Sequence, residues 1–226
     1  LCDLLRANLV AESYIPPKEI RNLRNIMRQR SSIVKGRTQM KNKIHAVLLM
    51  NGIKLPYTTL GIKSMQWIIE EIKITTIKSV LVSYINIVEQ FNFELKKLGE
   101  RINEIAMQNE KAKLLMTIHG IASVRALEII AEIGDIKRFE SSKKLCSYAG
   151  LVPGIKQSGT KIVFGRLIKQ ANKNLKYVLV ETCWSLVRVK ENNKFRDFYL
   201  KLSKKKGKQK AICATARKLC CVVYAM

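Results

Sequence analysis

A serine and a glycine, Ser158 and Gly159, stand at the head of a stretch that carries five basic residues and no acid and ends at Tyr177. A serine hydroxyl becomes a nucleophile when a base or a metal ion activates it. Glycine lets a second backbone approach closely, as attack on a phosphodiester requires. The pattern is compatible with attack on a nucleic-acid backbone. Taken alone it favours a polar loop, because isolated serines are common in loops.

The segment around this serine carries charge of one sign. No acid lies between Glu140 and Glu181, whereas a solvated helix normally mixes both signs, so the segment indicates contact with phosphates. Its basic residues are Lys143, Lys144, Lys156, Lys161, Arg166, Lys169, Lys173 and Lys176. The nucleic-acid contacts that we predict here are Lys156, Gly159, Lys161, Arg166, Lys169 and Lys173.

A glycine turn between two short helices is predicted from Leu114 to Asp135. Gly120 allows a positive φ at the turn, and the N–H groups that begin the second helix lack helical partners. With the helix dipole, these groups form a phosphate site without sequence preference. The turn resembles the helix-hairpin-helix DNA-binding motif, with Ala122 in place of the usual second glycine. The alternative is an ordinary helical hairpin. The predicted contacts are Gly120, Ile121, Ala122 and Ser123.

Composition indicates a helical, folded chain with an anionic partner. The chain has 226 residues, of which 47% are hydrophobic, enough to bury a core in one large domain or two small ones. Only 11 glycines and 4 prolines favour long helices over a turn-rich β fold. Lys and Arg number 42 against 17 acids, which gives a net charge of +25. Such self-repulsion indicates a polyanionic partner, with nucleic acid first and an anionic membrane second.

No membrane span, export signal or metal site is expected. The sequence has no run of about 18 apolar residues, and its start lacks the features of a secretory signal. The cysteines form no CxxC pair and have no histidine nearby, which favours reduced thiols over zinc ligands or disulfides. We therefore expect a cytoplasmic protein that has no membrane partner and holds no cofactor in this chain.

Two long helices are predicted in the first half. The first runs from Lys18 to Met50, is densely basic and ends at Asn51-Gly52. The second, at 75–109, repeats apolar residues every three or four positions and mixes glutamates with lysines, with a break expected near Gly99. It forms either a coiled-coil arm through which copies of the chain associate or an intramolecular helical hairpin.

Shorter elements follow residue 109. They are a helix from Ser141 or Ser142 to Ala149, a polar loop at 155–161, a short strand at 162–164, a helix that starts at Asn172 and a helical stretch from Asn192 to the C-terminus. Tyr177 and Trp184 stand among apolar residues at helical spacing, so we expect both in the core. The sequence thus predicts a mainly α fold. Its parts are a basic helical segment at 1–63, a long amphipathic arm at 64–109 and a small helical domain with the helix-hairpin-helix motif at 110–226.

Three stretches of the chain, in order, resemble the transposases of insertion-sequence family 110. They begin DLLRAN at Asp3, HGIASV at His119 and KKKGKQ at Lys204, and together they cover nearly the whole chain. The serine of the family's Ser-Gly motif falls on Ser158. The resemblance therefore implies that Ser158 is the nucleophile of a DNA transposase or site-specific recombinase.

The resemblance also implies partners that this chain does not contain. Members of the family have an N-terminal RNase-H-like domain whose four acidic residues hold a divalent metal such as Mg²⁺. That domain and the serine domain come from different subunits and form one composite site. A structured guide RNA pairs with target and donor DNA. DLLRAN normally follows the last acidic pair, so Asp3 is not one of the four, and we expect the metal site to be missing here.

Three functions remain open at this point. The first is the recombinase just described. The second is a non-catalytic helix-hairpin-helix module that binds DNA or RNA, and the third is a helical interaction protein whose charge serves RNA or membrane association. No His, Asp or Glu lies close in sequence to Ser158, which fits a composite site that is activated from another domain.

Overall fold

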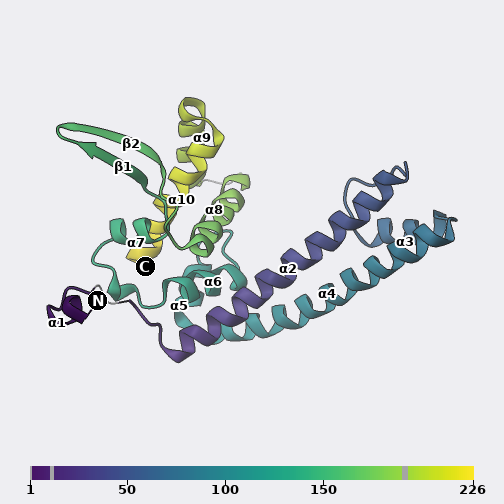
Figure 1. The fold of residues 1–226 in the computed structure, drawn as a ribbon, viewed down its shortest axis with the longest axis horizontal. Helices are drawn as coiled ribbons and strands as arrows, with labels where there is room; N and C mark the ends of the chain where they lie inside the picture. Colours follow the sequence, from purple (N-terminus) through teal and green to yellow (C-terminus); the bar gives the residue numbers. More distant parts are fainter. Residues whose placement is uncertain (1, 11–12, 190–192) are drawn as a thin grey trace. The chain divides into compact units, whose positions relative to one another are not determined.

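The computed structural model describes residues 2–10, 13–189 and 193–226 and divides into two compact units (Figure 1). The first unit consists of Leu1–Arg24 and Glu128–Met226, and the second of Asn25–Leu127. The predicted mainly α fold is confirmed, because helices make up most of the described chain. The domain division predicted from the sequence stays a prediction. The predicted start of the last helical stretch, at Asn192, lies outside the described residues.

The elements follow one another along the chain in a simple order. The first half contains α1 (Cys2–Arg6), α2 (Lys18–Met50), α3 (Ile62–Glu71), α4 (Thr75–Gln108), α5 (Glu110–Met116) and α6 (Ser123–Ile133). The second half contains the 3₁₀ helix η1 (Ile136–Arg138), α7 (Ser142–Tyr148), β1 (Pro153–Ser158), β2 (Lys161–Leu167), α8 (Lys173–Arg188), α9 (Lys194–Lys206) and α10 (Lys208–Ala225). None of the described helices is long and apolar enough to cross a bilayer.

The two long helices were predicted with nearly their observed bounds. α2 ends as expected, with Gly52 at φ +67° and the Ile53 amide donating to the Leu48 carbonyl at 2.9 Å. The break expected in α4 near Gly99 is wrong, because α4 is continuous. A single glycine costs a helix only about 1 kcal/mol, which the packing of an amphipathic face outweighs.

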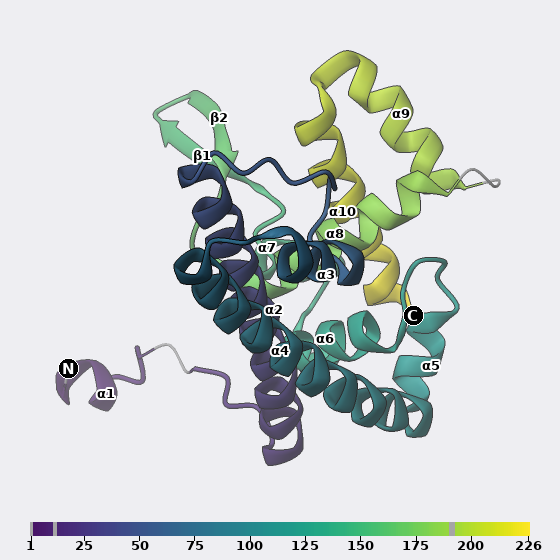
Figure 2. The ribbon, with the colours of Figure 1, turned by 90° about the vertical axis from the view of Figure 1, so that its right-hand side faces the viewer.

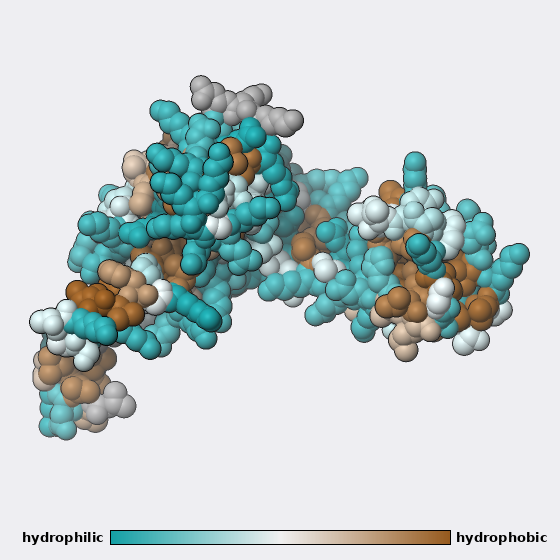
Figure 3. Space-filling view, turned by 90° about the horizontal axis from the view of Figure 1, so that it is seen from above, coloured by the Kyte–Doolittle hydropathy of each residue, from teal (hydrophilic) through white to brown (hydrophobic). Residues whose placement is uncertain are grey.

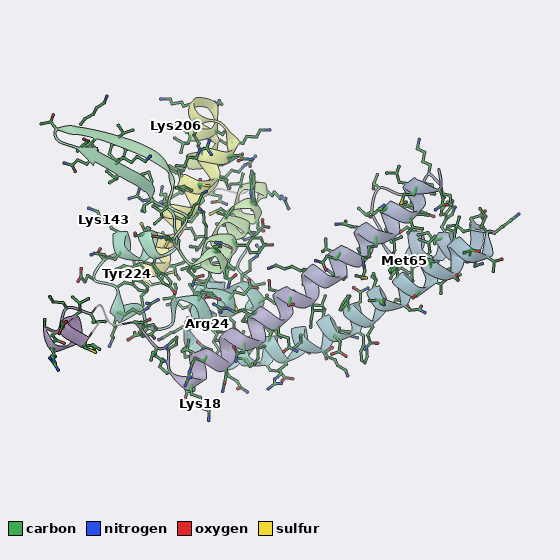
Figure 4. All side chains as sticks on the ribbon, in the orientation of Figure 1. Lys18, Arg24, Met65, Lys143, Lys206 and Tyr224 are labelled. Atoms are coloured by element: carbon green, nitrogen blue, oxygen red, sulfur yellow. The ribbon has the colours of Figure 1, made fainter. Side chains whose placement is uncertain are left out.

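The second unit has a core built from α2, α3 and α4. Ile44 and Leu48 of α2, Ile68 of α3 and Ile85 and Val88 of α4 are all buried in one cluster. Figures 1 and 2 show α2 and α4 side by side, and Figure 4 labels Met65 of α3 in this core. Of the two alternatives left open for the long amphipathic helix, the intramolecular hairpin is therefore present within this chain.

A glycine of α2 sets how closely the two long helices approach. A Cβ atom at Gly36 would lie 3.0 Å from the ring of Phe91 on α4, closer than side chains usually pack, so a larger residue here would require the ring to shift by a few tenths of an ångström. Next to it, Arg37 Nη1 donates to Asn92 Oδ1 at 3.0 Å. Lys41 donates to the Leu60 carbonyl at 2.6 Å, and burial lowers the pKa of Lys41. Part of the positive charge of α2 therefore serves the fold.

Helix α10 is central to the first unit, where it packs against α7, α8 and α9 (Figure 2). Buried side chains of this unit include Leu145 of α7, Leu179 and Leu186 of α8 and Leu219 of α10. The helix predicted from Asn172 is confirmed, because the Asn172 side chain caps α8 by accepting from the Leu175 amide at 3.0 Å.

A β-hairpin, which was predicted only in part, belongs to this unit. β1 and β2 pair antiparallel, so the expected polar loop at 155–161 is wrong and the expected strand at 162–164 is only part of β2. Gly159, at φ +58°, takes the first central position of a two-residue turn, as glycine does in type II′ turns. In Figure 1 the hairpin extends away from the helices of its unit.

The two aromatic residues of α8 that were expected in the core differ in how far they are buried. Tyr177 is 64% exposed, so the expectation is wrong for this residue. Trp184 is half-buried and packs edge-on against Tyr199 of α9, with ring centroids 5.8 Å apart. The helical spacing was correct, but Tyr177 lies on the face of α8 that no neighbouring helix covers.

Candidate nucleophile and nucleic-acid interface

Ser158 is the last residue of β1 and lies at the tip of the hairpin. It is exposed, its cross-strand partner is Lys161, and among the described residues its hydroxyl has no hydrogen-bond partner. The neighbouring Gly159 and Thr160 form the turn and are exposed as well. A hydroxyl in this position is accessible to a large second molecule, which a buried serine would not be.

The alternation of side chains gives the hairpin two different faces. Ser158 shares its face with Lys156 and, across the ladder, with Lys161. Directly opposite residues in a sheet have Cβ atoms about 5 Å apart. The structure therefore brings the serine and two of its predicted phosphate contacts together on one exposed surface.

The opposite face of the hairpin is exposed and mainly apolar, with Gln157 as a polar member. Ile155, Ile162 and Phe164 share it, and their exposed fractions are 62%, 52% and 68%. A register shift between Pro153 and Ile155 marks a bulge near the root of the hairpin. Large apolar side chains that the fold itself leaves uncovered are typical of a surface that meets another molecule.

The remaining predicted contacts of this unit lie away from the tip. Arg166 is near the root of the hairpin, on β2. Lys169 lies in the connection to α8, and Lys173 is the first residue of α8. All three side chains are exposed. They stay predictions as phosphate contacts.

The predicted glycine turn lies in the second unit. Gly120 has φ +83°, and the Ile121 amide donates to the Ile118 carbonyl at 3.0 Å, which closes the turn. Ala122 precedes α6 and has no side-chain oxygen that could cap the amides of the first turn. Those N–H groups therefore have no cap from this position. Phosphate binding by the turn at Gly120, Ile121, Ala122 and Ser123 stays a prediction.

Glu132 of α6 is a buried carboxylate that the sequence analysis missed. Its Oε2 accepts from Asn172 Nδ2 at 2.8 Å and lies 3.7 Å from Arg24 Nε, and its Oε1 accepts from Asn174 Nδ2 at 3.2 Å. Figure 4 labels Arg24 beside α6. Because Asn172 also caps α8, the carboxylate fixes the point at which the chain leaves the hairpin and enters that helix.

Arg138 shows that some cations of the first unit are used by the fold. Its guanidinium lies over the rings of Tyr14, Phe139 and Tyr148, 4.1 to 4.5 Å from their centroids. Its Nε donates to the Ile133 carbonyl at 3.2 Å. The charge of the exposed lysines is therefore a better measure of nucleic-acid binding than the total charge.

The cysteines are free thiols that pack mostly inside the first unit. Burial raises the pKa of the Cys183 thiol to about 12, so this side chain is a neutral core residue. Cys146 and Cys221 lie with their sulfur atoms 3.7 Å apart. Within the described part of the chain, no three His, Cys, Asp or Glu side chains gather closely enough to hold a metal ion.

A groove that was not predicted lies between the root of the hairpin and helices α9 and α10. Its volume is about 920 Å³. The basic side chains that line it are Arg166, Lys205, Lys206, Lys210 and Arg217, and no acid is among its lining residues. Figure 4 labels Lys206 at the end of α9. The basic run from Lys204 to Lys210 was visible in the sequence, but which of its members face β2 depends on the fold.

Comparison with known proteins relates this part of the chain to a family of transposases. Residues 112–200, which include the hairpin and Glu132 with its two asparagine partners, match the family model described as Transposase IS116/IS110/IS902 family. The chain thus carries the domain of these transposases, and the resemblance inferred from the sequence is confirmed.

Individual relatives match much of the chain. It is 27% identical over 217 residues to the transposase for insertion sequence element IS1111A of Coxiella burnetii, covering 92% of this chain and 59% of that protein. It is 27% identical to the transposase for IS1328 of Yersinia enterocolitica, covering 68% of this chain and 46% of that protein. It is 33% identical over 132 residues to a pilin gene-inverting protein of Moraxella bovis, covering 58% and 41%. The chain spans about half the length of these relatives.

Proposed function

We propose that this chain is the serine-bearing part of a DNA transposase or recombinase and that Ser158 is its nucleophile. The observation that carries the proposal is the position of Ser158. It lies exposed at the tip of a projecting hairpin, between two lysines on the same face, inside the segment that matches the transposase family. Two of the relatives are named as transposases and one as a gene-inverting protein, and both names denote rearrangement of DNA.

The proposed step is a transesterification at a DNA phosphodiester. Ser158 Oγ attacks the phosphorus, a P–Oγ bond forms, and the bond from phosphorus to one sugar oxygen breaks. The serine proton ends on the departing sugar oxygen, so no oxidant or reductant takes part. The phosphoserine ester conserves the bond energy, and attack by another sugar hydroxyl rejoins the strand and releases the serine.

The surrounding residues have supporting roles in this proposal. Lys156 and Lys161 neutralise the charge that develops on the phosphate, and Gly159 allows the DNA backbone to approach. Arg166, Lys169 and Lys173 bind flanking phosphates, as does the turn at Gly120. None of these residues is a convincing general base for the serine.

The activating group and the partners are proposed to lie outside these residues. The described residues do not form a metal site, so the divalent metal expected for the family would belong to its acidic domain. A guide RNA is proposed from the resemblance alone. Self-association through the long helices is supported by exposed apolar side chains where α2 ends and α3 and α4 begin. Figure 3 shows apolar surface gathered at this end of the second unit, and its exposed apolar residues are Leu49, Met50, Ile62 and Ile74.

A pair of hydroxyl substitutions tests the nucleophile. In the longer protein that includes the RNase-H-like domain, Ser158→Ala is expected to reduce strand exchange at least about 1,000-fold, because the covalent intermediate cannot form. Thr160→Ala, which removes an exposed hydroxyl two residues away, should leave exchange within about twofold. Exchange is measured on labelled DNA, and the protein–DNA adduct is trapped on a denaturing gel.

The same experiment distinguishes a recombinase with a serine nucleophile from a non-catalytic nucleic-acid-binding module. Both variants should bind DNA as the unaltered protein does, since neither loses a charge. If Ser158→Ala exchanges strands at the normal rate, or still forms the covalent adduct, Ser158 is not the nucleophile. The helix-hairpin-helix binding module would then be the better description.

A further inference from the structure

We propose that the groove between the hairpin root, α9 and α10 binds unpaired DNA, with Phe164 as a stacking platform for a base. The groove residues meant here are Phe164, Arg166, Lys205, Lys206, Lys210 and Arg217, and they are called the groove set below. The inference rests on the proposed function only in its choice of DNA. The groove itself is defined by the structure.

The charge of the groove fits a polyanion. All five basic members of the groove set are exposed, and none of them forms an ion pair with another described residue. Lys210 and Arg217 are seven residues apart on α10 and therefore share one face of that helix, and Lys206, the last residue of α9, lines the same groove. A row of cations without acids attracts successive phosphates of one strand.

The amino end of α10 adds to this attraction. Gly207, at φ +80°, separates α9 from α10, and α10 begins at Lys208. Gly207 is the N-cap and has no side chain, so no side-chain oxygen at this position satisfies the first amides of α10. The helix dipole therefore reinforces the lysines at the same end of the groove.

The floor of the groove favours bases rather than a second backbone. Leu151, Pro153, Leu167 and Leu202 are among the residues that line it, and these side chains have no hydrogen-bonding groups. They cannot read base edges in a duplex groove, but they can cover the faces of unstacked bases. A volume of about 920 Å³ is also too small to enclose a duplex.

Phe164 supplies the aromatic surface that such a groove requires. Its ring is 68% exposed and lies at the groove, on the apolar face of the hairpin that it shares with Ile155 and Ile162. Stacking on an exposed aromatic side chain contributes about 1–3 kcal/mol per base and tolerates any sequence. The fold itself gives Phe164 no buried position, and a base stacked on its ring would cover it.

The lining favours DNA over RNA. Gln209 is the one uncharged polar side chain with a hydrogen-bonding amide among the residues that line the groove. Recognition of RNA commonly uses the 2′-hydroxyl as donor and acceptor, and the cations of the groove supply donors but no acceptor for it. A groove of cations and hydrocarbon binds the backbone and the base faces, which DNA provides without the hydroxyl.

Binding of a labelled oligonucleotide tests the proposal directly. Fluorescence anisotropy is measured for the 226-residue chain with 12-nucleotide oligothymidylate, with oligouridylate of the same length and with a blunt duplex of the same length. Phe164→Ala is expected to weaken oligothymidylate binding between about 5- and 150-fold, which corresponds to the stacking of one base. Tyr177→Ala, which removes an aromatic ring of similar exposure outside the groove, should change it less than twofold.

A matched pair of charge variants tests the cationic wall. The double variant Lys206→Gln, Lys210→Gln should lower the slope of log K against log salt by about 1.4, because each phosphate contact on a single strand contributes about 0.7. The variant Lys201→Gln, Lys204→Gln removes the same charge from exposed positions of α9 that do not line the groove, and its slope should change by less than half as much.

Several results would contradict the proposal that the groove binds unpaired DNA. These are equal effects of the two charge variants, an unchanged affinity of Phe164→Ala, tighter binding of the duplex, or tighter binding of oligouridylate. Ser158→Ala should leave oligothymidylate binding unchanged. A failure of the groove and a failure of the nucleophile are therefore distinguished, because the first appears in oligonucleotide binding and the second in strand exchange by the longer protein.

Discussion

The helical arm of the second unit and the β-hairpin of the first treat their apolar side chains in opposite ways. Leu81, Ile85 and Val88 of the arm are at most 1% exposed, whereas Ile155, Ile162 and Phe164 of the hairpin are all more than half exposed. The apolar residues of the arm are explained by the folding of this chain alone. Those of the hairpin are not, since an isolated two-stranded hairpin is only marginally stable. This difference supports the proposal that the apolar face of the hairpin meets a partner.

The largest effect is expected in the arm. Ile85→Ala should lower the free energy of unfolding by about 2–5 kcal/mol, because it leaves a cavity in a fully packed core. Ile87→Ala, two residues further along the same helix at a partly exposed position, serves as the control and should cost much less. Urea unfolding followed by circular dichroism measures both. Equal losses would mean that the α2–α4 seam is not the core of this unit.

A smaller effect is expected where the first unit anchors the hairpin. Glu132→Gln should cost about 1–3 kcal/mol, because the new amide donates where Asn172 and Asn174 already donate, and the ion pair with Arg24 is lost. Glu140→Gln makes the same chemical change at an exposed site paired only with Lys144, and should cost less than about 0.5 kcal/mol. Thermal and urea unfolding of the two variants decide whether the network holds the unit together.

The smallest effect on stability is expected on the hairpin itself. Ile162→Ala should change the free energy of unfolding by no more than about 0.5 kcal/mol, because the side chain is 52% exposed. Ile85→Ala, which is the same substitution at a buried position of α4, provides the reference. A loss above about 1 kcal/mol would show that the hairpin folds back on its own unit, and the contrast between the two regions would disappear.

The long helices could be predicted from the sequence because their signals are local and repeated. The period of the apolar residues predicted α4, and the stretch without proline up to Asn51-Gly52 predicted α2, both with nearly their observed bounds; Gly52 marked the end of α2 and Asn172 the start of α8, as the structure confirms. Each of these signals depends on a few neighbouring residues. The break expected at Gly99 failed because packing along the whole helix outweighs one unfavourable residue.

The hairpin and its supporting network depend on contacts between distant residues. The pairing of Ile155 with Phe164 is not visible in a charge pattern, although Gly159-Thr160 just before the β-branched pair Ile162-Val163 was an available turn signal. In the sequence, Glu132 is simply a charged residue of an amphipathic helix, with no local signal of its role. Its role depends on Asn172 and Asn174, about 40 residues away in the sequence, and on Arg24, more than 100 away.

The length of the hairpin limits how precisely it can place the Ser158 hydroxyl. Six residues of β1 hold the Ser158 hydroxyl about 20 Å from the root of the ribbon. A tilt of about 10° at that root then moves the oxygen by about 3.5 Å, whereas productive attack needs placement within about 0.5 Å. A hairpin of this length cannot by itself hold the hydroxyl within that tolerance. If Ser158 is the proposed nucleophile, the DNA that it meets completes the alignment, and the serine does not attack other phosphodiesters until the correct assembly holds the hairpin in place.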